Sequence, residues 1–317
     1  MPTSRLADAV LAVLTDTPVE VAAAALNMRV EDLADAVESY QTAGYRALED
    51  RVADHGWYHL RLHFPDWETA EQAAATALGP SLDHLHDIGL INAWWFIRKH
   101  PAWRLRLRPA GGVTPEVRSA IHAVLNDLAV SWVISRWRPG MYEPENASFG
   151  GAVGTEIAHD LFHADSHHML HYLRQPTHEV GRREVSMLLC STLLSAARLD
   201  RFERGDLWSR VAELRPLPAD TPPGRLEAMA DTIRPLVSAP IGSADPEGLC
   251  AFAAPWTEAF RHTGQLLSEA ATAGHLDRGV RHVLTHLVIF HWNRLGLSAT
   301  TQAILSRAAR DALLPRN

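Results

Sequence analysis

Residues 94–108 read Trp94-Trp95-Phe96-Ile97-Arg98-Lys99-His100-Pro101-Ala102-Trp103-Arg104-Leu105-Arg106-Leu107-Arg108. The stretch predicts two neighbouring strands, because a segment with two apolar faces is joined by a His-Pro turn to one in which arginines alternate with apolar residues. Alternate residues of a strand share a face, so we expect Arg104, Arg106 and Arg108 to lie together. Such a row indicates a carboxylate or phosphate site. A solvated basic face of an edge strand is the alternative.

The segments on either side of this pair alternate between strand and helix patterns. Apolar residues recur at every second position in a strand and at helical spacing in an amphipathic helix. The predicted strands cover residues 57–64, 91–97, 103–108 and 131–136, and the predicted helices between them cover residues 67–78 and follow Thr114-Pro115. This β-α-β-β-α-β order predicts an α+β fold in which a ferredoxin-like antiparallel sheet is covered on one face by helices.

Helix patterns fill the rest of the chain. Beyond Gly150 the predicted helices cover residues 157–173, 186–199, 224–239, 255–273, 278–295 and 299–314. Residues 1–52 contain shorter helix patterns with a helix-turn-helix-like joint at Asn27. We therefore predict an N-terminal helical docking module over residues 1–52 and a larger domain over residues 53–317, in which the sheet portion ends near residue 150 and a largely helical half follows.

Bulk composition narrows the class of protein. The chain has 317 residues and a formal net charge of −7, and no apolar run reaches the roughly 18 residues of a membrane span. The negative charge disfavours direct nucleic-acid binding, as does an N-terminal module without a basic recognition helix. Cys190 and Cys250 lie far apart and form no C-x-x-C pattern. We therefore expect a cytoplasmic protein with neither a disulfide scaffold nor a membrane partner.

Five histidines between residues 159 and 171 raise the question of a metal site. His167 and His171 are one helical turn apart, but the H-E-x-x-H pattern is missing because His168 stands at the glutamate position. Histidines on a polar helix face, or a hydrogen-bonded pair at a cleft, explain the cluster as well. No metal and no cofactor are predicted.

Two further segments carry polar groups suited to a site. Residues 142–151 combine a proline-stiffened loop, hydrogen-bond acceptors and a Gly-Gly pair, and form either a ligand loop or an ordinary connection from strand to helix. His291 and Arg294 lie inside an otherwise apolar helix pattern, where charged or titratable groups need partners or a cleft. His291 is therefore either a hydrogen-bonded core residue or a general acid-base group.

In combination, these segments resemble the C-terminal domain family of lantibiotic dehydratases, also called thiopeptide-type bacteriocin biosynthesis proteins. The resemblance covers roughly residues 55–310 and rests on motifs, in the family's order, at residues 57–62, 94–108, 142–151, 161–166 and 291–295. It implies elimination of glutamate from O-glutamylated Ser or Thr of a precursor peptide, which leaves dehydroalanine or dehydrobutyrine. The implied partners are the precursor peptide, with leader and core, and a separate glutamylating dehydratase subunit; a homodimer stays open.

The resemblance also implies roles for particular residues. Arg104 and Arg106 correspond to the family's paired elimination-site arginines, and His291 corresponds to its catalytic histidine, which would shuttle the proton. Elimination needs a base, enolate stabilisation and a receptor for the leaving dicarboxylic amino acid, and adjacent arginines suit the last of these. The residues expected to bind substrate are Arg98, Arg108, Tyr142, Glu145, Ser148, Asp165, Asn293 and Arg294.

One departure from the family pattern concerns the Gly-Gly loop. Full-length dehydratases often carry an arginine before the aromatic residue of this loop, whereas this chain has Ser148 before Phe149. The role of that arginine would then be lost or would fall to another residue, such as Arg98 or Arg136.

Two other functions therefore stay open beside elimination. The same fold supports a formal (4+2) cycloaddition of two dehydroalanines, which forms the pyridine of a thiopeptide and releases the leader peptide, and Ser148 is compatible with it. The retained Arg104, Arg106 and His291 favour elimination instead. The third hypothesis is a non-catalytic subunit that docks a peptide or a dehydratase through the N-terminal helices and the sheet edge.

Overall fold

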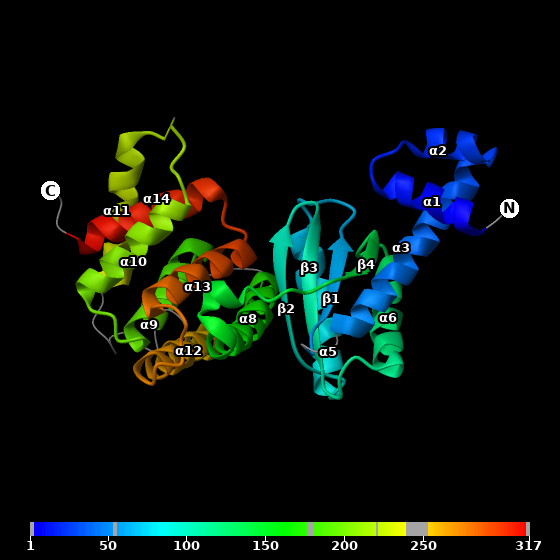
Figure 1. Ribbon diagram of the computed structural model, residues 1–317. Helices are drawn as coiled ribbons and strands as arrows, with labels where there is room; N and C mark the ends of the chain where they lie inside the picture. The colour runs from blue at the N-terminus through cyan, green and yellow to red at the C-terminus, as the bar shows by residue number, and fades with distance from the viewer. Residues whose placement is uncertain (1–2, 53–55, 176–179, 220, 239–252, 315–317) are drawn as a thin grey trace.

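The computed structural model describes residues 3–52, 56–175, 180–219, 221–238 and 253–314. Its centre is a four-stranded sheet that lies between a helical half and the N-terminal helices (Figure 1). The strands are β1 (Tyr58–His63), β2 (Ile91–Lys99), β3 (Ala102–Pro109) and β4 (Arg136–Gly140). They are ordered β2-β3-β1-β4, and every neighbouring pair is antiparallel. This is the predicted ferredoxin-like arrangement, so the α+β fold class is confirmed.

One face of the sheet is apolar and belongs to the main core. Leu60 pairs with Leu105 across β1 and β3, and Phe96 pairs with Leu105 across β2 and β3, and all three side chains are buried. The helix α6 (Pro115–Val130) covers this face near β4, where Tyr58 bonds to His122. The helix α5 (Gly79–Asp87) packs against β2. Burial of these large side chains drives the two layers together.

The opposite face of the same strands is basic. The strand register places His59 directly opposite Arg106, and it places Arg61 between Arg104 on β3 and Arg138 on β4. Like charges that lie directly opposite each other on neighbouring strands destabilise a sheet. This face therefore carries an electrostatic cost that the apolar face does not.

The helical half follows β4 and closes the open edge of β2. It comprises α7 (Asn146–Phe149), α8 (Gly151–Arg174), α9 (Arg182–Ala196), α10 (Arg201–Leu214), α11 (Pro223–Ser238), α12 (Ala254–Thr272), α13 (Val280–Leu295) and α14 (Ala299–Leu313). Ser166 on α8 accepts from the Phe96 amide, and Arg294 on α13 donates to the Phe96 carbonyl. Side chains from two helices thus satisfy backbone groups of the edge strand, which would otherwise invite another strand.

The N-terminal helices have a small core of their own. They are α1 (Thr3–Leu14), α2 (Val19–Leu26) and α3 (Val30–Val52), and Asn27 joins the last two with a left-handed backbone. Val10, Ala22, Ala23 and Leu33 form a buried cluster separate from the main core. The helix α3 continues from this cluster along β4 (Figure 1). The predicted module boundary at residue 53 and Cys250 lie outside the described residues.

Three sequence predictions about elements need correction. The strand predicted over residues 131–136 is wrong except at Arg136, where β4 begins, because α6 runs to Val130 and a turn with Trp132 in the left-handed region follows. The predicted helix over residues 67–78 begins at Ala70 and continues through a π-helical turn, η2 (Ala74–Leu78), directly into α5. The helix α10 was not predicted, because charged residues interrupt its apolar pattern.

The other predicted helices occur, with ends displaced by a few residues. The helix predicted over residues 224–239 ends at Ala239, which lies outside the described residues. Within the part of the chain that the structure describes, no helix combines the length and apolar character needed to cross a membrane.

The Gly-Gly pair serves the connection between the sheet and the helical half. Gly150 and Gly151 have φ angles of 78° and 90°, which side chains rarely adopt. A Cβ atom on Gly151 would lie 2.2 Å from a carboxylate oxygen of Asp277. Both observations favour the structural interpretation of the pair over a ligand loop.

We expect Gly151→Ala to lower the free energy of unfolding by about 1–3 kcal/mol, because it forces a side chain into the left-handed region and against Asp277. Gly111→Ala is the matched control, since nothing lies within 4 Å of its Cβ position and its φ is not in that region. Urea unfolding measures the free energy of unfolding of both variants. Equal stability of the two variants would contradict this account of the pair.

Candidate functional site

A cavity of about 380 Å³ opens on the basic face of the sheet. His59 and Arg61 from β1 and Arg104 and Arg106 from β3 line one side. The loop of residues 141–145 after β4 lines the other, with Met141, Tyr142, Glu143, Pro144 and Glu145. Successive side chains of β1 and β3 point to opposite faces of the sheet, and the register of the two strands brings the four basic side chains together on one face. We call this space the arginine cavity.

Arg106 is the most deeply buried charge in the arginine cavity, with 3% of its surface exposed. Its guanidinium lies 4.0 Å from the centre of the Trp95 ring and 4.9 Å from that of Tyr142, so the cation is held between two aromatic faces. Burial lowers the pKa of Arg106 to about 10, and Arg104 acts in the same direction. The group therefore stays charged at neutral pH.

None of the cavity's arginines has a counter-ion among the described residues. Arg98, Arg108 and Arg294 each form an ion pair with a carboxylate, whereas Arg61, Arg104 and Arg106 form none. Nε of Arg106 is also buried without a hydrogen-bond partner. A buried cation without a partner is costly, so the cavity favours an anion that enters from solvent.

His59 is the second buried polar group of the arginine cavity, with 4% of its surface exposed. Neither ring nitrogen has a hydrogen-bond partner. Gly140 makes room for the ring, because a Cβ atom there would lie 2.8 Å from the His59 Cδ2 atom. Burial, followed by Arg106, Arg61 and Arg104, lowers the pKa of His59 to about 2. The imidazole is therefore neutral, and one of its nitrogens is a free acceptor.

Tyr142 faces the arginine cavity with its ring and turns its hydroxyl away from it. The hydroxyl lies 2.7 Å from Nε2 of His159, which is buried on α8. Burial raises the pKa of Tyr142 above its ordinary value. Tyr142 therefore acts as an aromatic wall for Arg106 and offers no acid-base group to the cavity.

His291 belongs to a second group of polar side chains, which is fully buried in the helical half. We call this group, made of Asp165, Ser186, Trp256, His291 and Arg294, the buried Asp165 cluster. Nδ1 of His291 lies 2.9 Å from a carboxylate oxygen of Asp165, and its Nε2 lies 3.0 Å from the Ser186 hydroxyl, both within hydrogen-bond distance. Arg294 pairs with the other carboxylate oxygen of Asp165, and Trp256 donates to Asp165 at 2.9 Å. Although burial opposes ionisation, His291 and Arg294 hold the pKa of Asp165 below its ordinary value.

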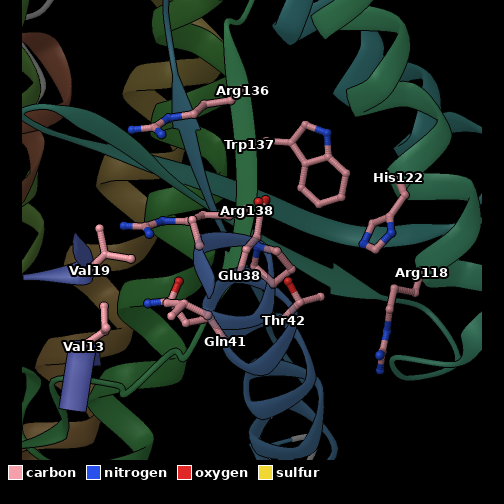
Figure 2. Close-up of a pocket in the computed structure, with 13 residues that line it drawn as sticks. Val13, Val19, Glu38, Gln41, Thr42, Arg118, His122, Arg136, Trp137 and Arg138 are labelled. Carbon is pink, nitrogen blue, oxygen red and sulfur yellow. The ribbon is translucent and has the colours of Figure 1, made fainter. Parts of the chain in front are cut away.

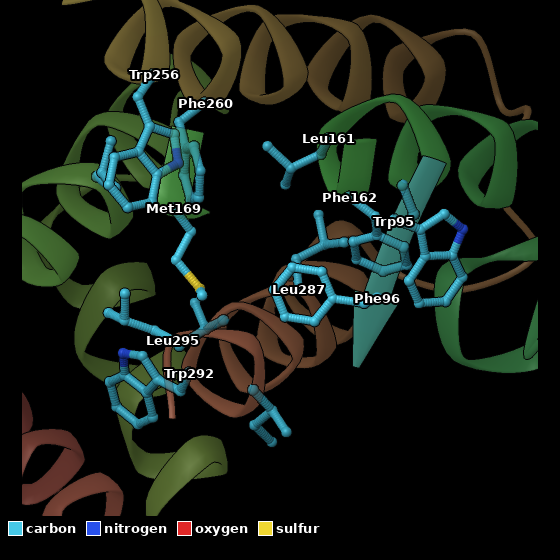
Figure 3. Close-up of a cluster of buried hydrophobic side chains, with 14 of the residues drawn as sticks. Trp95, Phe96, Leu161, Phe162, Met169, Trp256, Phe260, Leu287, Trp292 and Leu295 are labelled. Carbon is cyan, nitrogen blue, oxygen red and sulfur yellow. The ribbon is translucent and has the colours of Figure 1, made fainter. Parts of the chain in front are cut away.

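Packed aromatic rings separate this cluster from the arginine cavity. Arg106 lies on Trp95, Trp95 packs on Phe162 at a centroid distance of 4.8 Å, and Arg294 lies on the Phe162 ring at 4.7 Å. Figure 3 shows Trp95 and Phe162 within the apolar cluster that fills this space. Both ring nitrogens of His291 are already bonded. The geometry therefore argues against a direct proton shuttle by His291, and it favours the interpretation as a hydrogen-bonded core residue.

The remaining predicted site residues are scattered. Arg98 pairs with Glu71 and lies over Trp103, on the apolar side of the sheet, so it is not placed to replace the missing loop arginine. Arg108 shares the face of Arg104 and Arg106 but pairs with Glu156 outside the cavity lining.

Two more of these residues lie elsewhere. Ser148 is part of α7 and does not line the arginine cavity. Asn293 accepts from Gln302 at the junction of α13 and α14. Of the eleven predicted residues, the cavity brings together Arg104, Arg106, Tyr142 and Glu145.

The histidines of α8 are distributed over different partners. His163 lies 3.0 Å from the Trp94 carbonyl oxygen, His167 bonds to Asp83 at 2.9 Å, and His159 bonds to Tyr142. No three metal-ligating side chains converge among the residues that the structure describes.

A second cavity, of about 710 Å³, lies between the N-terminal helices and the β4 edge. One wall comes from the N-terminal helices and carries the apolar Val13, Val19 and Val37 together with the polar Glu38, Gln41 and Thr42. The other wall carries Arg136 and Arg138, which point out from β4 in Figure 2. We call this space the β4 groove.

Sequence reasoning missed His59 and Arg61. The signal was present in residues 57–64, where His59, Arg61 and His63 alternate with apolar residues as the arginines of β3 do. In the predicted ferredoxin-like order the first strand lies beside the third, so their polar faces had to meet. Neither the depth of His59 nor its lack of partners could be inferred from that pattern.

Comparisons with known proteins show the family to which the chain belongs. Residues 57–313 match the family model described as lantibiotic biosynthesis dehydratase C-term, and the chain therefore belongs to that family. A search of curated proteins finds no match. The arginine cavity and the buried Asp165 cluster both lie inside the matched range, whereas the N-terminal helices α1 to α3 lie outside it.

Three solved structures share the fold. The tRNA-dependent lantibiotic dehydratase MibB from Microbispora sp. 107891 is 20% identical, with a TM-score of 0.61 over 81% of this chain and 28% of the MibB chain. TsrL is 16% identical, with a TM-score of 0.55 over 82% of this chain and 99% of its own. TbtD, a pyridine synthase from thiomuracin biosynthesis, is 15% identical, with a TM-score of 0.55 over 81% and 97%. This chain thus spans little more than a quarter of MibB.

We expect Asp165→Asn to lower the free energy of unfolding by about 3–5 kcal/mol, because it leaves the buried Arg294 uncompensated. Asp231→Asn, which removes an exposed ion pair within α11, is the control and should cost less than about 1 kcal/mol. Urea unfolding measures the free energy of unfolding of both variants against wild type. The double variant D165N/R294M should recover much of the loss, and a double variant no more stable than Asp165→Asn would contradict the assignment.

Proposed function

We propose that this protein eliminates glutamate from O-glutamylated Ser or Thr residues of a precursor peptide, which leaves dehydroalanine or dehydrobutyrine. The observation that carries the proposal is the unpaired, buried Arg106, flanked by Arg104 and Arg61 in one cavity. Membership in the lantibiotic dehydratase C-terminal family supports it.

The reaction needs a cationic receptor at the point where charge develops. Removal of the Cα proton builds negative charge on the enolate, and rupture of the Cβ–O bond releases glutamate as a carboxylate. Arg104 and Arg106 would bind the departing carboxylate, since guanidinium groups pair with carboxylates in two parallel hydrogen bonds. Because the aromatic walls hold Arg106 in place, the donor needs no reorganisation during the reaction. Glu145, exposed at the cavity rim, would pair with the free amino group of the glutamyl moiety.

The proposal includes two partners and a compartment. The precursor peptide is the substrate, and a separate subunit must supply the glutamylated form, because elimination consumes what glutamyl transfer from glutamyl-tRNA produces. Both steps then take place in the cytoplasm, where charged tRNA is found.

Pyridine synthesis by cycloaddition is the second candidate. The match to nearly the whole length of TbtD supports it, as does Ser148 at the position before Phe149. A cyclase has no leaving glutamate to bind, however, so an unpaired arginine trio in a cavity favours elimination.

Arg106→Gln should slow elimination at least about 100-fold, because it removes the charge that stabilises the developing carboxylate. The assay is mass spectrometry of a pre-glutamylated precursor peptide after incubation with purified protein. Arg183→Gln is the matched control, since Arg183 is exposed on α9 and lines neither cavity. Wild-type protein that leaves the glutamylated peptide unchanged would overturn the proposal, and conversion of a linear dehydrated peptide into a pyridine macrocycle would establish the second candidate.

We also propose that the β4 groove holds an acidic segment of the precursor peptide. Its lining offers valines on one side and two arginines, Arg136 and Arg138, against the carboxylate of Glu38, which suits an amphipathic acidic segment. Arg138 is the cross-strand neighbour of Arg61, so the groove and the arginine cavity lie on one continuous face.

In the double variant R136Q/R138Q we expect KM for the full-length glutamylated peptide to rise about tenfold while kcat changes little, because only binding is affected. Steady-state kinetics on this peptide and on a short glutamylated core fragment measure the effect, and the fragment should show no change. An unchanged KM for the full-length peptide would exclude the groove as its docking site.

A further inference from the structure

We propose that His59 is the general base that removes the Cα proton of the glutamylated residue. The inference rests on the proposed elimination and goes beyond it, because it assigns a proton acceptor that neither the family resemblance nor the comparisons supply. It is carried by the position of a buried, unbonded imidazole inside the arginine cavity.

His59 lies next to the residue proposed to receive negative charge. His59 on β1 is the direct register partner of Arg106 on β3, so the two side chains lie side by side on one face of the sheet. A Cα–H bond that points at His59 would therefore hold its carbonyl group near Arg106. Proton abstraction beside a carbonyl requires a base and an oxyanion receptor within reach of the same substrate group.

The other polar groups of the cavity are donors, are already bonded, or lie in water. The titratable groups that line the cavity with His59 are Arg61 on its own strand, Arg104 and Arg106 on β3, and the loop residues Tyr142, Glu143 and Glu145. Guanidinium groups only donate hydrogen bonds, and the Tyr142 hydroxyl is bonded to His159. Glu143 and Glu145 are exposed to water, whereas His59 is buried beside Arg106. His59 is therefore the buried acceptor of this set that has an unbonded nitrogen.

Substrate binding is electrostatically coupled to the basicity of His59. Burial is the largest cause that opposes protonation of His59, and the cations Arg106, Arg61 and Arg104 add to it. A bound glutamyl carboxylate pairs with those cations and reduces their effect on the ring. His59 would therefore be a stronger base in the complex than in the empty cavity.

The proposed elimination accounts for every proton and electron pair. The His59 nitrogen takes the Cα proton, the freed electron pair forms the Cα=Cβ bond, and the Cβ–O bond breaks as glutamate leaves as a carboxylate. The imidazolium then returns its proton to the departing carboxylate or to water, and neutral His59 is restored.

The test compares His59→Gln, Glu145→Gln and wild type on the pre-glutamylated peptide. We expect His59→Gln to lower kcat about 100- to 10,000-fold, with KM changed by less than a few-fold, because the arginines that bind the glutamyl group are intact. Binding of free glutamate to His59→Gln, followed by calorimetry, shows that the cavity is still folded. His59→Ala should regain activity when imidazole is added, which a merely structural role would not allow.

The outcomes separate this inference from the proposed function. If wild type fails to eliminate glutamate, the proposed function fails. If wild type eliminates and Arg106→Gln does not, but His59→Gln keeps more than about a tenth of the wild-type kcat, His59 is not the base. A fall in kcat of Glu145→Gln at unchanged KM, with His59→Gln active, would assign the base to Glu145 and overturn the inference, whereas a rise in KM alone reports its binding role.

Discussion

The burial of Arg106 without a counter-ion is the constraint on which the candidate site depends. A guanidinium that has lost most of its water needs compensation, and the faces of Trp95 and Tyr142 supply it, since no carboxylate of the described residues forms an ion pair with Arg106. Aromatic faces hold the cation without neutralising it. The positive charge is therefore available to an incoming anion, and the cost of burial becomes binding energy when the anion arrives.

The rest of the structure keeps this arrangement in place. The ferredoxin-like register sets His59, Arg61 and Arg104 around Arg106, and the loop after β4 adds the Tyr142 wall. Behind Trp95, Phe162 on α8 fixes the ring from the other side. The buried Asp165 cluster ties α8, α12 and α13 together and reaches β2 through Arg294 and the Phe96 carbonyl. Polar groups in the helical half thus position the aromatic floor of the cavity, although they do not enter it.

The sequence was sufficient for the fold and for part of the site. Alternation along β1 and β3 predicted which side chains share a face, because the strand period is fixed by backbone geometry. Local signals were weaker at the turn after α6, where an apolar segment resembled a strand. The helix α10 was missed although Asp200 and Glu203 form a capping box at its start.

The pairing of distant residues was beyond the reach of such patterns. His291 and Asp165 are 126 positions apart, and their contact depends on how four helices pack. For the same reason the sequence could not show that Arg106 is buried and unpaired while Arg108, two residues later, is paired with Glu156.

The central claim is that the arginine cavity is a receptor for the carboxylate of glutamate. The most direct measurement is a titration of the wild-type protein with L-glutamate, followed through the NMR signal of the Arg106 Nε–H group, which has no partner in the described structure. We expect this signal to shift saturably with glutamate and to stay unchanged with L-glutamine amide, which has the same carbon skeleton but carries carboxamides in place of both carboxylates. An Arg106 signal that is unaffected by glutamate, or that responds equally to both ligands, would contradict it.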